Sequence, residues 1–499
     1  MKILLLSLLL IKCLWMAQGF IGAPHPHGQR EKIGYNRKHS LHASSSSSED
    51  NNNNNNNNNN DNDSLWKSLR QRVVELQSTT RQRRTAWQGA TCETAVSLVL
   101  PGGAWVRRLD MGTYPYVACG SAPAGDVFVG NLATGAVVAV GRVGGDGSDY
   151  TSNIIDTDHE ESEFELAQRT ERLARTLYHG YDGGGTLAIA FAGTLICEAR
   201  RSGGVYLWRL DEQAAAASTN EKASPSALVP QGSIPALDGQ WATALHLDDD
   251  YLWVGTAHGK VQAYALQDDH HPPLALQTTP TLQWTLGGNE TIITSLALHN
   301  AYGVGAAATS AGSVDLFAVE EAGDASQDDQ PTLGSFFPPF DSPERKSMHA
   351  FPSSVEFVEV NHDNDDDDTQ KELLVAAGGN NGDIFLQPLE LTTAGEIDAT
   401  RPFQKPLRPL RPRHFGACQC LCSPLPGILI SGGQDGGIRC WEIQGDGPNK
   451  NGSPLTNNNN ACLYQFVGYK VWLGSLITDG DRLISDGADN TVVVHDFSK

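Results

Sequence analysis

Short apolar segments alternate along most of the chain with turns rich in glycine and aspartate. The apolar segments are rich in β-branched and small residues and are too short for typical helices, as in residues 186–193, 241–247, 292–299 and 471–480. Glycine and aspartate suit tight turns because they tolerate or locally stabilise the backbone angles that these turns require. The pattern predicts hairpin units, each with a strand, a loop, a second strand, a turn and a third strand.

The third strand of each unit carries an aromatic residue or a residue that stands in its place. The intervals between these seven anchors are 80, 56, 53, 68, 56 and 54 residues. A near-fixed period indicates a repeat architecture, in which each unit buries its faces only against its neighbours. The seven anchors are Phe128, Trp208, Tyr264, Phe317, Phe385, Trp441 and His495.

The motif in these units resembles the WD repeat, most clearly in the last two units. Trp208 and Trp441 keep the tryptophan of the WD signature, although no unit keeps the full Trp-Asp pair. The resemblance covers roughly residues 98–499. It implies an all-β fold, with a single seven-bladed β-propeller of four-stranded blades. It also implies a non-catalytic protein-interaction scaffold rather than an enzyme.

Many WD repeats contain a buried hydrogen-bonded set of His, Ser, Asp and Trp, and the resemblance extends to these positions. In the seventh unit, Tyr469 stands where the histidine belongs and His495 where the tryptophan belongs. We interpret such a set as structural, because it satisfies buried polar groups and locks the blade. The sixth unit can supply all four residues, namely His414, Ser431, Asp435 and Trp441.

The chain ends almost directly after the third strand of the seventh unit, so that blade lacks an outer strand. Residues 94–101, which precede the first unit, have the β-branched composition of a strand. We therefore expect this segment to complete the seventh blade. Such pairing would close the ring and remove its exposed sheet edges.

The N-terminal region has the composition of a targeting leader. Residues 1–19 have a charged start, an apolar core and a small-x-small end, which predicts a signal peptide cleaved before Phe20. Residues 20–48 are basic and serine-rich, like a transit peptide. A signal sequence, a phenylalanine and such a segment together resemble the bipartite plastid leaders of diatoms and related algae. This favours the plastid, with the secretory pathway or the extracellular space as the alternative. No stable membrane anchor is expected once the leader is removed.

Three further segments complete the predicted domain organisation. Residues 49–63 contain an asparagine tract and are expected to be a disordered spacer. Residues 64–90 predict a helix, with a stripe of Leu65, Leu69, Val73 and Leu76 that we expect to pack on the propeller. Residues 91–499 are expected to form the propeller. A helical insertion is expected at about residues 160–178, between the first two blades.

The formal net charge of the chain is −22. An acidic protein is repelled by phosphate backbones, so we do not expect nucleic-acid binding. Two basic segments oppose this trend, one at residues 70–84 and one at residues 401–414. The second has prolines at 406, 409 and 412, which favour an extended segment. We interpret it as an exposed connection between blades, or as a docking segment in which Arg408, Arg411 and Arg413 bind an acidic protein partner.

Catalytic and metal-binding motifs are not evident in the sequence. There is no G-x-S-x-G elbow, Walker loop or H-E-x-x-H motif, so no catalytic residue, cofactor or metal ligand is predicted. Cys418, Cys420 and Cys422 alternate along a predicted strand, which would place all three thiols on one face. We interpret them as small buried hydrophobes rather than metal ligands. The alternative to a scaffold is a propeller enzyme, a hydrolase or a redox enzyme with its site in the central channel.

Overall fold

The computed structural model describes the propeller and one long helix. The described residues are 58–101, 105–122, 126–141, 185–200, 204–217, 227–234, 241–267, 275–276, 279–287, 291–319, 332–340, 350–361, 371–392, 395–444, 461–469, 473–487 and 490–498. The predicted leader (1–19 and 20–48) and the predicted helical insertion near residues 160–178 lie outside these ranges.

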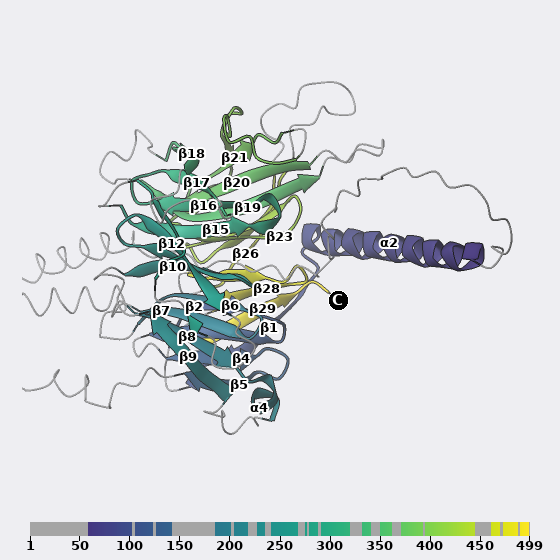
Figure 1. Ribbon diagram of the computed structural model, residues 1–499, viewed down its shortest axis with the longest axis horizontal. Helices are drawn as coiled ribbons and strands as arrows, with labels where there is room; N and C mark the ends of the chain where they lie inside the picture. Colours follow the sequence, from purple (N-terminus) through teal and green to yellow (C-terminus); the bar gives the residue numbers. More distant parts are fainter. Residues whose placement is uncertain are drawn as a thin grey trace, which may run out of the picture.

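The described strands form seven antiparallel sheets, six of four strands and one of five. Consecutive sheets pack face to face around a ring (Figure 1). The prediction of an all-β, single seven-bladed β-propeller is therefore confirmed. In most blades the strand order follows the chain, from the inner strand to the outer strand. The exceptions are the third blade, in which two strands pair with the same third strand, and the seventh.

Blades 1 to 3 follow one another along the chain. Blade 1 contains β2 (Trp105–Met111), β3 (Tyr116–Ala122), β4 (Val127–Asn131) and β5 (Ala136–Gly141). Blade 2 contains β6 (Thr186–Ala192), β7 (Leu195–Arg200), β8 (Val205–Leu210) and β9 (Leu228–Ile234), with the short helix α4 (Glu212–Ala217) after β8. Blade 3 contains β10 (Ala242–Leu247), β11 (Tyr251–Thr256), β12 (Lys260–Gln267), β13 (Ala275–Leu276) and β14 (Leu282–Thr285).

Blades 4 to 7 complete the ring. Blade 4 contains β15 (Ile293–His299), β16 (Val304–Thr309), β17 (Val314–Ala318) and β18 (Thr332–Phe336), with a 3-10 turn, η4 (Asn300–Tyr302), after β15. Blade 5 contains β19 (Pro352–Asn361), β20 (Lys371–Gly379), β21 (Ile384–Leu389) and β22 (Arg408–Leu410). Blade 6 contains β23 (Cys418–Leu425), β24 (Ile428–Gly433), β25 (Ile438–Glu442) and β26 (Ala461–Phe466). Blade 7 contains β27 (Leu476–Thr478), β28 (Arg482–Asp486), β29 (Thr491–Asp496) and β1 (Glu93–Val99).

All seven sequence anchors lie in the third strand of their blades, but two are out of register. Trp208 and Trp441 are each the fourth residue of their strands, whereas Phe128 and Phe385 are the second. The equivalent fourth positions hold Gly130 and Gln387. The space over Gly130 is filled by Leu98, and the buried Gln387 amide donates to backbone carbonyls of Pro388 and Lys405. The predicted anchors of blades 1 and 5 were therefore wrong, because the anchor position of these blades holds no aromatic residue.

A β-bulge recurs at one position in six blades, between the inner strand and the second strand. Three bulged residues join their blade to the next through a hydroxyl that donates to a backbone carbonyl. These bonds run from Thr243 to Ile293 (2.6 Å), from Thr294 to Pro352 (2.7 Å) and from Ser353 to Cys418 (2.8 Å). The bulges thus provide polar links near the axis of the ring.

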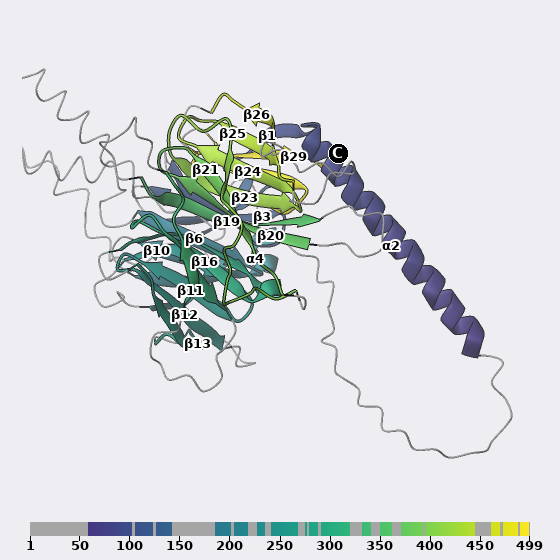
Figure 2. The same ribbon diagram turned by 90° about the horizontal axis from the view of Figure 1, so that it is seen from above.

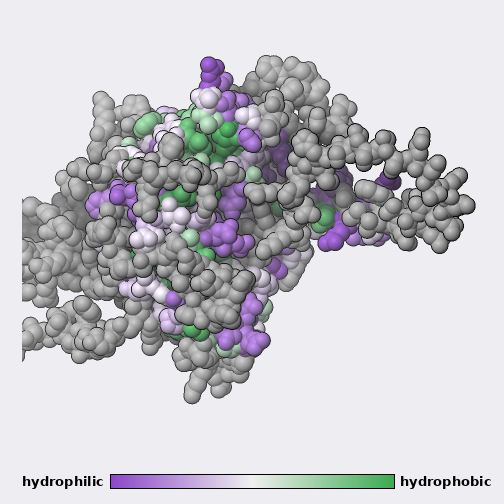
Figure 3. Space-filling model, viewed as in Figure 1, coloured by the Kyte–Doolittle hydropathy of each residue, from purple (hydrophilic) through white to green (hydrophobic). Residues whose placement is uncertain are grey.

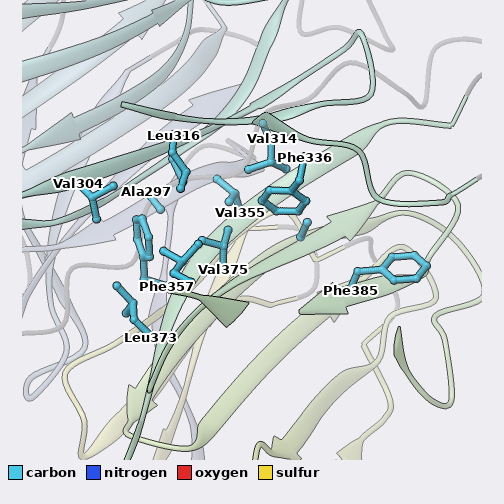
Figure 4. Close-up of a cluster of buried hydrophobic side chains, with 14 of the residues drawn as sticks. Ala297, Val304, Val314, Leu316, Phe336, Val355, Phe357, Leu373, Val375 and Phe385 are labelled. Atoms are coloured by element: carbon cyan, nitrogen blue, oxygen red, sulfur yellow. The ribbon is translucent and has the colours of Figure 1, made fainter. Parts of the chain in front are cut away.

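The main hydrophobic clusters lie between neighbouring blades, as stacking of two-sided sheets requires. Figure 4 shows one of them, in which residues of blades 4 and 5 face one another. Leu316, Val355, Phe357 and Val375 are all buried in it. Since each blade is covered on both faces, its strands have near-continuous apolar sequences rather than a strict alternation.

The bulge in blade 6 separates the three alternating cysteines. Cys420 and Cys422 pack in the cluster between blades 6 and 7, whereas Cys418 packs in the cluster between blades 5 and 6. The bulge between Cys418 and Cys420 reverses the side-chain direction at that point. The expectation that all three thiols share one face was therefore wrong, although their interpretation as buried hydrophobes agrees with their environment.

The first described strand closes the ring, as the sequence predicted. β1 pairs with β29 from Glu93 opposite Asp496 to Val99 opposite Thr491, and it forms the outer strand of blade 7. Leu98 is buried and points over Gly130 of blade 1. A Cβ at position 130 would collide with this side chain, so glycine at this position admits the closing strand.

The N-terminal helix α2 (Asn58–Gln88) begins earlier than expected and projects away from the propeller (Figures 1 and 2). Residues 58–63 are helical, so the predicted disordered spacer at 49–63 was wrong at its end. Extending an existing helix costs less than starting one, which favours growth into the asparagine tract. We also expected Leu76 to pack on the propeller, and this was wrong, since its side chain is 40% exposed.

Among the described side chains of α2, those in its last turns contact the propeller. Trp87 is buried, stacks on Phe497 at 3.7 Å between ring centroids and donates its indole N–H to the Gly480 carbonyl. Arg83 pairs with Asp481, and the Gln88 amide donates to Glu442. None of the helices in the described part of the chain has the length and hydrophobicity that a bilayer crossing requires.

Shortening Leu98 should destabilise the closed ring. The change Leu98→Ala is expected to lower the free energy of unfolding by about 2–5 kcal/mol, because it leaves a cavity over Gly130. Val96 lies on the same strand but is 60% exposed, so Val96→Ala should change the free energy by about 0.5 kcal/mol or less. Urea unfolding of the two variants measures the difference, and equal values would contradict the closure.

Candidate interaction face and buried polar sets

The four polar residues of the sixth unit lie together inside blade 6. Trp441 donates its indole N–H to the Ser431 hydroxyl at 2.9 Å, and Ser431 is 2.8 Å from His414 Nε2. His414 Nδ1 is 2.9 Å from Asp435 Oδ1. With Asp435 ionised and His414 neutral, the imidazole donates to the carboxylate and accepts from the hydroxyl. Two neighbouring strands, the turn between them and the connection that enters blade 6 are thereby fixed to one another.

Several hydrogen-bond donors stabilise the ionised form of Asp435. Burial opposes its ionisation, but hydrogen bonds from His414 and from the Phe415 backbone N–H lower its pKa well below the usual range. Arg439 donates to the other carboxylate oxygen at 3.0 Å. Burial also lowers the pKa of His414, against the opposing effect of Asp435. The set therefore holds a neutral imidazole beside a carboxylate.

The Ser431–His414–Asp435 order resembles a nucleophilic triad, but its position prevents that use. Ser431 is fully buried and His414 is 1% exposed. Ser431 also accepts a hydrogen bond from Trp441, which occupies its oxygen. Because no substrate can reach the hydroxyl in this arrangement, the geometry supports the structural role that the resemblance implied.

Blade 7 has a different polar set at the corresponding place. Tyr469 Oη is 2.5 Å from His495 Nε2, and Thr94 Oγ1 is 2.7 Å from His495 Nδ1. The Ser485 hydroxyl donates weakly to Tyr469 at 3.5 Å. Burial lowers the pKa of His495 to about 4. This set connects the closing strand, through Thr94, to the interior of the last blade. Asp489, a further residue of the seventh unit, lies outside the described residues.

The basic, proline-rich segment is largely neutralised by the propeller itself. Arg408 lies in the outer strand of blade 5 and pairs with the buried Glu372 at 2.9 Å. Lys405 pairs with the same carboxylate at 3.1 Å, and Arg411 pairs with Asp383 at 2.8 Å. Arg413 is half-buried, and no ion pair involves it within the described residues. The expectation of an exposed connection was therefore wrong for Arg408, whose strand pairing and ion pairs give it a structural position.

Four large exposed apolar side chains share one face of the ring, which the sequence analysis missed. Each lies in a connection from the outer strand of one blade to the inner strand of the next. In a propeller these connections lie on one face, together with the turns between second and third strands. We call this the linker face and the opposite one the hairpin face. The four residues are Trp241, Phe337, Phe415 and Val467, with exposures of 38%, 66%, 89% and 74%.

The exposure of Phe415 is maintained by its neighbours in the chain. Its backbone N–H donates to Asp435, and the preceding His414 is locked in the blade 6 set. The backbone that carries the aromatic ring is thus fixed by its neighbours.

Figure 3 shows hydrophobic residues gathered in the region of β18 and β21, and Phe337 directly follows β18. A sequence signal existed in the form of large apolar residues beside predicted strand ends, but it does not separate exposed from buried residues.

Two buried carboxyls have pKa values near neutrality but do not form a pair. Burial raises the pKa of Glu198 to about 7, although Arg200 and Thr186 bind it. Burial likewise raises the pKa of Asp486 to about 7, against backbone N–H donors from Gly474 and Ser475. They belong to blades 2 and 7, with blade 1 between them. Within the described residues, no group of three or more His, Cys, Asp or Glu could hold a metal ion.

Removing Asp435 should destabilise blade 6. Asp435→Ala leaves His414, Arg439 and the Phe415 N–H without their acceptor, and we expect a loss of about 1–3 kcal/mol in the free energy of unfolding. The exposed Glu396 offers a control, because Glu396→Ala removes a carboxylate without breaking a buried set. Denaturant unfolding of both variants gives the values. An unchanged stability for Asp435→Ala would refute the structural role.

Blade 7 should weaken in acid through His495. Its pKa is about 4 in the folded protein and about 6.5 in an unfolded chain, so below pH 6.5 the unfolded state binds more protons. The contribution of His495 is complete above pH 6.5 and falls as the pH drops toward 4. The difference in unfolding free energy between wild type and His495→Gln should therefore shrink over this range. Unfolding curves at pH 7, 5.5 and 4.5 test this, and a constant difference would contradict it.

Comparison with known proteins gives limited similarity. No protein-family model matches this chain. A stretch of 79 residues, 16% of this chain, is 30% identical to Mitochondrial division protein 1 of Kluyveromyces lactis, and the match covers 11% of that protein. The crystal structure of the WD40 β-propeller domain of Doa1 aligns with a TM-score of 0.45 and 11% identity, over 81% of this chain and 97% of that one.

The assignment of the fold consequently depends on the geometry of this chain. Seven blades in sequential order, an outer strand of the last blade supplied by the N-terminal side, and a buried His–Ser–Asp–Trp set occur together here. The chain has the WD40-type seven-bladed β-propeller fold.

Proposed function

We propose that this protein is a non-catalytic interaction scaffold that binds a protein partner on its linker face, in the plastid. WD40 propellers typically bind proteins, and the exposed Phe415 is the observation that carries the proposal for this chain. A phenylalanine that is 89% exposed gains much from burial in a partner, since aromatic side chains contribute strongly at interfaces.

The rigidity of the linker face supports a binding role. Phe415 lies between a buried histidine and an inner strand, so little backbone freedom remains to be lost on binding. Phe337, Trp241 and Val467 provide further apolar contacts on other blades of the same face. Apolar anchors with polar surroundings are the usual arrangement of a binding surface.

An acidic partner remains favoured at one end of this face. Arg411 and Arg413 precede Phe415 in the same connection, and the Arg411 side chain is 58% exposed even though it pairs with Asp383. Asp383 is buried, so Arg411 would keep this bond and offer its remaining N–H donors to a partner carboxylate. The plastid location rests on the leader at residues 1–48, whose composition resembles bipartite plastid leaders.

Affinity purification from isolated plastids tests the proposal. We expect a protein that is recovered with the wild type and with Val229→Ser, but at least tenfold less with Phe415→Ser. Val229 is 42% exposed on the outer strand of blade 2, away from the linker face, so it is the matched control. Equal melting temperatures would confirm that the variants fold.

Two results would overturn the proposal. Recovery of the same proteins with wild type and Phe415→Ser would show that the linker face does not carry the contact. Detection of the native chain in the secretory lumen or the medium, and not in plastids, would refute the location while leaving the interaction face to be tested there.

A further inference from the structure

The N-terminal helix α2 presents a second surface, separate from the linker face. Its last turns contact Gly480 and Glu442, which lie at turns or strand ends of the hairpin face. Before these turns, every residue from 67 to 82 whose side chain is described is exposed. We call residues 67–82 the arm. Figure 2 shows it leaving the propeller without a neighbouring element along most of its length.

An apolar line runs along the arm at coiled-coil spacing. Trp66, directly before the arm, and Leu69, Val73 and Leu76 within it follow one another at intervals of three, four and three residues. The same line continues at Thr80, Arg83 and Trp87. Arg83 and Trp87 are two of the residues that contact the propeller. The apolar line of the arm is therefore the outward continuation of the helix face that is buried at the anchor.

The described apolar side chains on and beside this line are exposed. Leu76 is 40% exposed and the neighbouring Val74 is 63% exposed. An isolated helix gains most of its stability from packing of its apolar side, and short helices in water are marginal without it. The anchor fixes one end of α2, whereas all described side chains of the arm are exposed. A second helix on the apolar line would bury apolar side chains there.

The charge of the arm indicates the chemistry of that helix. Lys67, Arg70, Arg72 and Arg81 are opposed within the arm by Glu75 alone. Arg70 and Arg72 flank the apolar line, at the positions that face the flanking residues of a partner in a coiled coil. This local excess of positive charge lies in a chain whose net charge is −22. Acidic residues beside the apolar line of the partner would complement it.

We propose that the arm binds an acidic amphipathic helix of another protein in a two-helix coiled coil. A second copy of the same helix fits less well, because it would bring the basic flanks of two arms together. A membrane surface also fits less well. The apolar line is narrow, whereas helices that lie in the bilayer interface bury a broad apolar face.

A synthetic helical peptide can test the arm with the full chain. The peptide has leucines at intervals of three and four residues and glutamates at the flanking positions, and a matched peptide has lysines in place of the glutamates. Fluorescence anisotropy should show binding of the acidic peptide that weakens with salt, and at least tenfold weaker binding of the basic peptide. Equal binding of both peptides, or binding of neither, would overturn the proposal.

Two variants separate the apolar line from general charge effects. Leu76→Asp should weaken binding of the acidic peptide at least tenfold. Ser68→Asp adds the same charge on another side of the exposed arm and should change binding less than threefold. Because neither residue is buried, both variants should keep the melting temperature of the wild type. Similar losses in both would overturn the assignment of the apolar line.

Two other measurements identify the competing occupants. Sedimentation velocity of the free chain should show a monomer. A dimer that Leu76→Asp abolishes would overturn the proposal in favour of a second copy. Vesicles with anionic lipids should not bind the chain in flotation assays. Binding to them that Leu76→Asp abolishes would overturn the proposal in favour of a membrane surface.

Discussion

The pairing of β1 with β29 is the contact on which the ring depends. Every blade buries its two faces against its neighbours, so blade 7 and blade 1 can be covered only if the ring is closed. The closing partners are more than 390 residues apart in sequence, and such a long loop is entropically costly to close. Several contacts offset this cost at one place. Leu98 fills the space over Gly130, and Trp87 stacks on Phe497 beside the same strands.

The polar sets of blades 6 and 7 show how degenerate repeats keep the same structural function. In blade 6 a histidine, a serine, an aspartate and a tryptophan satisfy one another in the interior. In blade 7 a tyrosine and a histidine occupy the corresponding positions, and the chain of contacts reaches Thr94 on the closing strand. The requirement is the satisfaction of buried polar groups rather than a fixed residue type. In blade 7 this requirement also connects the two ends of the propeller.

The fold could be predicted from the sequence because turn chemistry and strand composition repeat with the blade. The closing strand could be predicted because the last unit is one strand short. The register was less predictable, since Phe128 and Phe385 lie near the expected spacing but Gly130 and Gln387 occupy the anchor position. Whether a position is filled by its own side chain or by a neighbour's, as Leu98 does for Gly130, depends on contacts between distant segments.

Some candidate residues could be predicted from the sequence and others could not, because their roles depend on contacts with distant segments. The blade 6 set has a residue-type signature, so His414 and its three partners could be named from sequence. Arg408 could not be recognised as a structural residue, because its partner Glu372 lies in a different strand, 36 positions earlier in the chain. The bulges escaped prediction as well. They depend on pairing with the second strand and change the direction of residues such as Cys418 without a mark in the sequence.

The anchor of α2 also determines how the two exposed surfaces relate to each other. Trp87 and its neighbours bind the hairpin face at blades 6 and 7, whereas Phe415 lies on the linker face. The helix is continuous from Asn58 to the anchor, so it has no hinge at which a basic arm could fold back on an acidic body. Its stiffness therefore keeps the arm clear of the ring despite the opposite charges. A helix bound to the arm and a partner bound to the linker face would not compete for space, which is the property that a scaffold requires of two binding surfaces.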